Sequence, residues 1–188
     1  MAAHCDIWTE PFSGVQFDLL NPKPESINVL DIAWALSNQC RFAGHVDRFY
    51  SVAQHTLLVA ANVPQEFHAV ALLHDAGETW TGDITAPVKK ALRALDGSPV
   101  SGLDWIETQI WCAIRERFAH LDLPPLIPSE VHLADRRALV TERRDLRTDS
   151  GLDWGTDGVE PFANRIEPME QWEVYEQLLN AFHKAGIR

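Results

Sequence analysis

The alternation of apolar and polar positions along the chain predicts a protein built mainly from helices. From residue 101 onward, apolar side chains recur at spacings of three and four, which is the pattern of a helix with one buried face. These side chains are Leu103, Ile106, Ile110, Ile114 and Phe118. Capping residues or prolines mark helix starts near residues 28, 51, 64, 85, 101, 129 and 168. The helix from residue 101 to about residue 120 is expected to be the longest.

The first 26 residues follow a different pattern, in which Pro, Gly and Asn recur. Two short apolar pieces, residues 6–8 and 15–20, are expected to pair there as a small hairpin. A polar segment rich in Gly and Asp, over about residues 148–164, precedes the last helix. The chain should therefore form one all-α domain over residues 1–188, with six or seven helices and a small non-helical N-terminal lobe.

The composition limits the binding partners and the cellular compartment that are expected for the protein. The net charge of -11 argues against a nucleic-acid polymer as partner, because such binding depends on a basic surface. The three cysteines are odd in number and form no CxxC pair, so they are interpreted as buried thiols in a reducing interior. The start resembles no signal peptide, and no apolar run approaches the roughly 20 residues that span a bilayer. A cytoplasmic protein without membrane attachment is expected.

Candidate chemistry gathers in residues 41–90. Five groups that can coordinate a metal or move a proton lie there: His55, His74, Asp75, Glu78 and Asp83. An isolated His-Asp pair is common by chance and is weak support for a metal site. The arrangement as a whole favours metal, because His55, the His74-Asp75 pair and Asp135 come from three predicted helices. Imidazole and carboxylate ligands suit a transition metal such as Zn, Mn or Co.

The same stretch resembles a known family, the HD-domain metal phosphohydrolases, whose signature is H…HD…D. The likeness is closest to the small 5'-deoxynucleotidases and to the phage dATP triphosphohydrolases. It runs from Cys40 to Asp135, about half of the chain, in the order found in that family. The matching segments are residues 40–42, 50–55, 72–78, 81–83, 87–89 and 134–135.

This resemblance implies a fold and a metal centre. The fold would be an HD-domain helical bundle, and the ligands of one divalent transition metal (Zn, Co or Mn) would be His55, His74, Asp75 and Asp135. Glu78 would be the catalytic acid or base, and this is favoured over its being a solvated carboxylate at a helix end. His132, about one turn before Asp135, is a minor alternative ligand.

The resemblance also implies residues that bind substrate. Arg41 suits a bidentate contact with phosphate, and Phe42, where most relatives carry Trp, could stack on a base. Asp83 would accept a hydrogen bond from the sugar, or else cap the helix that follows it. Lys89 would support phosphate, or else be an ordinary solvated lysine.

The implied function is hydrolysis of 2'-deoxynucleoside 5'-phosphates, leaning to a dATP triphosphohydrolase that releases nucleoside and triphosphate. The enzymatic alternative is a 5'-deoxynucleotidase acting on deoxynucleoside monophosphates. An alternative of another class is a non-catalytic nucleotide-binding module that the metal stabilises. Hydrolysis of ppGpp is disfavoured because Thr79, not an acid, follows Glu78. As in relatives, a homo-oligomer, either a dimer or a hexamer, is expected.

Overall fold

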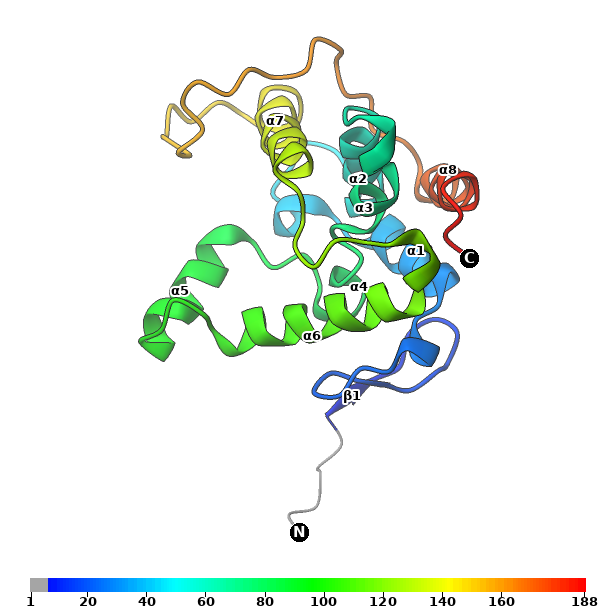
Figure 1. Ribbon diagram of the computed structural model, residues 1–188. Coiled ribbons are helices and arrows are strands. Elements are labelled where there is room, and N and C mark those ends of the chain that lie inside the picture. The colour runs from blue at the N-terminus through cyan, green and yellow to red at the C-terminus, as the bar shows by residue number, and fades with distance from the viewer. Residues whose placement is uncertain (1–6) are drawn as a thin grey trace.

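The computed structural model describes residues 7–188 and is mostly helical, as predicted (Figure 1). Cys5 and the first residue of the predicted hairpin lie outside the described residues. The helices are α1 (Val29–Asn38), α2 (Val52–Ala60), α3 (His68–Leu73), α4 (Glu78–Thr81), α5 (Ala86–Asp96), α6 (Gly102–Arg117), α7 (Ser129–Leu146) and α8 (Gln171–Lys184). Short 3-10 turns are η1 (Pro24–Ser26), η2 (Arg41–Gly44), η3 (Gln65–Phe67) and η4 (Ala119–Leu121).

Helix starts follow the capping residues that the sequence offers. Asn28 Oδ1 accepts a hydrogen bond from the backbone N–H of Leu30 at 2.9 Å, and Ser51 Oγ accepts one from Gln54 at 3.1 Å. Ser101 and Asp104 form a reciprocal capping box at the start of α6. All seven predicted helix starts lead into helices, and the single turn α4 is additional. The prediction of the longest helix is wrong, since α7 has 18 residues and α6 has 16.

Helix α2 lies at the centre of the bundle, where it packs against α1, α3, α7 and α8 (Figure 1). Its side chains are buried around most of its circumference. A buried polar group in this position is costly unless it is paired. His55 of α2 is fully buried.

The N-terminal lobe is the predicted hairpin, in which β1 (Trp8–Thr9) pairs antiparallel with β2 (Phe17–Asp18). Phe17 is fully buried, and its ring stacks on Trp80 with the ring centroids 4.1 Å apart. Ser13 donates hydrogen bonds to Asp31 of α1 through its backbone N–H and its hydroxyl, both at 2.7 Å. These contacts fix the lobe to the helical core.

Helix α5 extends from the bundle beside α6 and buries none of its residues (Figure 1). Its basic side chains pair with α6: Lys89 with Glu107 at 2.7 Å, and Arg93 with Asp104. On α6 the predicted burial of Cys112 is wrong, because its side chain is exposed, while Cys40 is half-buried. Of the described helices, none has the length and apolar character that crossing a bilayer requires.

The long segment between α7 and α8 is tied to the bundle by Asp145. Its side chain is 2% exposed and accepts hydrogen bonds from Arg144 Nε at 2.7 Å, Arg165 Nη1 at 2.6 Å and the backbone N–H of Ile166 at 2.9 Å. The hydrogen bond from Arg144, together with the other donors, lowers the pKa of Asp145 from 3.8 to about 2. The ionised carboxylate is therefore the form that anchors the segment.

We expect Asp145→Asn to lower the free energy of unfolding by about 1–3 kcal/mol, because the amide keeps the shape of the group but loses charge-assisted hydrogen bonds. Because the folded pKa is depressed, this stabilisation is present above about pH 4 and is lost as the pH falls toward about 2. Urea unfolding of both proteins over this range measures the difference. A difference that does not shrink on acidification would contradict the anchoring role.

Candidate metal centre

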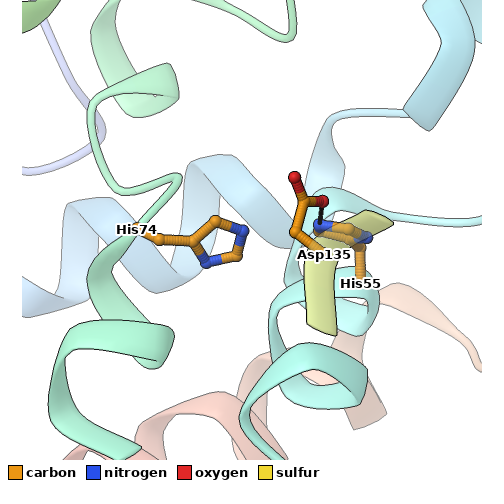
Figure 2. A group of neighbouring side chains, drawn as sticks. All are labelled: His55, His74 and Asp135. Atoms are coloured by element: carbon orange, nitrogen blue, oxygen red, sulfur yellow. Dashed lines mark ion pairs between the residues drawn. The ribbon is translucent and has the colours of Figure 1, made fainter. Parts of the chain in front are cut away.

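Three side chains that are distant in sequence converge at the centre of the bundle. His55 comes from α2, His74 from the turn that follows α3, and Asp135 from α7 (Figure 2). One ligand atom from each residue lies within 4.8 Å of the other two. This group could hold a metal ion, as the sequence predicts.

The environment of His74 exposes one nitrogen lone pair to this centre. Its Nδ1 lies 2.7 Å from the backbone carbonyl oxygen of Ala71, which can only accept a hydrogen bond. In the neutral imidazole, the form that binds a metal, Nδ1 must therefore carry the proton, and the lone pair resides on Nε2. Nε2 is buried and makes no hydrogen bond within residues 7–188. A buried nitrogen in this state is suited to a metal.

His55 is held in the same tautomer by a carboxylate. Its Nδ1 lies 2.6 Å from Oε1 of Glu142, and both side chains are fully buried. Burial raises the pKa of Glu142, but Arg41 and His55 outweigh burial and leave the pKa below its ordinary value. The carboxylate is thus ionised and accepts the proton of Nδ1. The Nε2 atom of His55 then faces the centre, again without a hydrogen bond from the described chain.

Asp75, the fourth predicted ligand, lies beside these three side chains. Its Oδ2 lies 3.2 Å from His74 Nε2 and 3.5 Å from His55 Nε2, and Asp135 Oδ1 lies 3.2 Å from His55 Nε2. Metal bonds of about 2.0–2.1 Å in a tetrahedral site separate neighbouring ligand atoms by about 3.3–3.4 Å. The three spacings of 3.2–3.5 Å lie close to this value, so the donor set could hold a small divalent ion. His132, the minor alternative, is exposed on α7.

The charges at the centre favour an added cation. Burial and the charge of Arg41 lower the pKa of His55, but Glu142 and Asp135 outweigh them and raise it to about 10. For His74, burial lowers the pKa and Asp75 reverses the shift, so the net direction is again upward. Carboxylates therefore attract positive charge at both imidazoles. A divalent cation supplies that charge in place of protons.

Glu78 lies beside this centre but not on a continuation of α3. The helix ends at Leu73, a turn covers residues 74–77, and α4 starts at Glu78. Gln39 Nε2 donates to the backbone oxygen of Glu78 at 2.9 Å and so fixes its position. Within the described chain, the buried Oε2 of Glu78 has no hydrogen-bond partner. Burial, then Asp75 and Asp83, raise its pKa well above the ordinary value.

Two of the four predicted substrate-binding residues lie at the centre. Arg41 Nη1 is 3.9 Å from both Asp75 Oδ2 and Asp83 Oδ1. Asp83 does not cap α5, since Thr85 occupies the N-cap position. Burial lowers the pKa of Arg41, but Glu142, Asp75 and Asp83 outweigh burial and raise it, so the guanidinium is charged. Arg41 and Asp83 are therefore available beside the candidate metal ligands.

Phe42 and Lys89 differ in how well they fit their predicted roles. Phe42 follows Arg41 in the left-handed backbone region at φ 57, where a non-glycine residue is strained, and strain of this kind often marks functional sites. Its ring lies 5.4 Å from the guanidinium carbon of Arg41. Lys89, in contrast, is paired with Glu107 at 2.7 Å. Its ammonium group is thus engaged on the surface of α6.

Comparisons with known proteins give relatives along nearly the whole chain. No family profile matches the sequence. The chain is 39% identical over 176 residues to Uncharacterized protein YfdR of Escherichia coli K12, and the match covers 92% of each chain. It belongs to the YfdR family. An uncharacterized protein of Rhodobacter capsulatus is 34% identical over 140 residues, in a match that covers 70% of this chain and 66% of the relative.

The sequence analysis of this YfdR-family chain does not identify two side chains that lie against predicted site residues. Glu142, which holds His55, lies about two helical turns after Asp135 and so shares its face of α7. That spacing is the signal that could have indicated it. Trp154, in the segment after α7, lies near Phe42 with the ring centroids 6.0 Å apart. No periodic pattern marks Trp154, because its segment is not helical.

Proposed function

We propose that this protein is a divalent-metal phosphohydrolase of the HD-domain type, acting on 2'-deoxynucleoside 5'-phosphates. The observation that carries the proposal is the set of two buried imidazole Nε2 atoms, each free of hydrogen bonds within residues 7–188 and each 3.2 Å from a carboxylate. Zn, Co or Mn fits a mixed nitrogen and oxygen set. A metal held there supplies a Lewis acid for the phosphoryl oxygen and lowers the pKa of water.

The surrounding side chains fit the other parts of such a reaction. Arg41 carries a fixed positive charge next to the ligands and would bind a nonbridging phosphate oxygen. Glu78 has a buried oxygen without a partner in the described chain and would move a proton to or from the phosphate ester. Asp83, held near Arg41, would accept a hydrogen bond from the sugar.

The number of phosphates distinguishes two candidate substrates. The sequence resemblance leans to a triphosphate, and dATP is the first substrate to test. The pairing of Lys89 with Glu107 favours the second candidate, a deoxynucleoside monophosphate, because it removes one of the cations available for additional phosphates. Both candidates require the same metal centre.

A turnover screen tests the proposal. The purified protein, stripped of metal and reloaded with Co, Mn or Zn, is incubated with each common dNMP and dNTP, and nucleoside, phosphate and triphosphate are resolved. Deoxyadenosine plus triphosphate from dATP would identify the triphosphohydrolase. Phosphate from several dNMPs would identify the 5'-deoxynucleotidase. Absence of turnover with every metal and substrate would contradict the proposal and leave the nucleotide-binding module.

A further inference from the structure

Glu142 connects two groups that the proposed function assigns to different tasks. Its Oε1 accepts from Nδ1 of His55 at 2.6 Å, and its Oε2 accepts from Nη2 of Arg41 at 3.3 Å. Its side chain is 0% exposed. Each oxygen thus serves one group, and the two groups lie on different parts of the chain, α2 and η2.

Burial of a carboxylate such as Glu142 is energetically unfavourable unless its contacts compensate for the lost hydration. Removing a charge from water costs several kcal/mol per ion, and a well-packed apolar residue would often stabilise the core as well or better. Glu142 does not join surface elements, as Asp145 does, because His55 and Arg41, which hydrogen-bond to it, are residues of the proposed site. The buried Tyr50 also lies beside it, and the charge of Glu142 adds to burial in raising the pKa of Tyr50. The contacts of Glu142 therefore have a use in the site beyond holding helices together.

We infer that Glu142 is a positioning residue that holds the metal ligand His55 and the phosphate-binding Arg41 in a fixed relation to each other. On the His55 side it fixes the ring orientation and directs Nε2 toward the metal. On the Arg41 side it directs the guanidinium toward the place where a metal-bound phosphate would lie. The part of this inference that concerns Arg41 rests on the proposed function. The part that concerns His55 depends only on metal binding.

Glu142→Gln tests the contacts with His55 and Arg41 while changing the shape of the side chain little. The amide has one oxygen acceptor and one NH₂ donor, so it cannot accept from both His55 and Arg41. Loss of the carboxylate behind a ligating histidine typically weakens metal affinity by about 10–100-fold. With Arg41 no longer held, KM at saturating metal should rise by about tenfold, more than kcat falls. Glu142→Asp keeps the charge and should recover part of both losses.

Asp145→Asn is the matched control. It is the same kind of amide substitution on a buried carboxylate of α7, but the partners of Asp145 are Arg144 and Arg165. Metal affinity of the stripped proteins is measured by competition with a chromophoric chelator. The Co(II) proteins are compared by their visible absorption spectra. We expect Glu142→Gln to change both readouts and Asp145→Asn to change neither.

The metal readouts need no substrate, so they remain informative if the turnover screen fails. In that case the positioning of Arg41 by Glu142 is tested by measuring the binding of inorganic phosphate to the Zn-loaded proteins by calorimetry. If Glu142→Gln does not fold, Glu142→Asp is expected to show smaller changes in the same direction. Wild-type metal affinity and a wild-type Co(II) spectrum in a folded Glu142 variant would overturn the inference.

Discussion

Asp135→Ala is expected to lose metal and activity together, with metal affinity weakened by more than about 100-fold and turnover reduced to background. Asp135 Oδ1 lies 3.2 Å from His55 Nε2 and provides the ligand from α7. The other carboxylate beside the two histidines, Asp75, is already used as a ligand in the proposed set. Three remaining ligands would bind a divalent ion less tightly and would leave it poorly oriented. Elemental analysis after dialysis and the turnover assay measure the two losses.

The fold should survive this substitution, because the side chain of Asp135 is 38% exposed and fills no core space. Melting temperatures of wild type and variant should therefore agree in the presence of a chelator, and differ when metal is added, since only the wild type gains stability from binding. Asp149→Ala, which removes an 87% exposed carboxylate after α7, is the control. Retained metal stoichiometry with retained turnover in Asp135→Ala would show that the fourth ligand is wrongly assigned.

Local sequence signals predict most of the helical framework. Asn28, Ser51 and Ser101 accept the backbone hydrogen bonds expected of caps, and a cap acts within one turn of its own position. The four predicted ligands also come together, although they lie on separate elements. Their convergence could be expected from the sequence only through a resemblance. Neither spacing nor periodicity specifies how α7 packs on α2.

The features that were not predicted depend on that packing. Glu142 looks in the sequence like a solvated helix residue, since Glu is rarely fully buried unless it is paired. It becomes a partner of His55 only because α7 lies against α2. The pairing of Lys89 with Glu107 similarly depends on how α5 lies on α6.

Glu78→Gln is expected to lower kcat by about 10²–10⁴-fold while leaving metal content unchanged. The substitution removes the group that would transfer a proton, but Glu78 is not among the proposed metal ligands. KM should change little if Glu78 acts mainly on the transition state. Steady-state kinetics at saturating metal, together with elemental analysis, measure both quantities. Glu130→Gln, which changes an exposed carboxylate in the first turn of α7, is the control.

The stability of the same variant distinguishes a catalytic carboxylate from a structural one. The buried Oε2 of Glu78 has no hydrogen-bond partner in residues 7–188, and Asp75 and Asp83 repel its charge. A neutral amide should therefore leave the melting temperature equal or higher, whereas replacing a structural carboxylate such as Asp145 should lower it. Full turnover in a folded Glu78→Gln protein would remove Glu78 from the mechanism. Loss of turnover with metal retained would instead argue against a module that only binds nucleotide, because such a module has no turnover to lose.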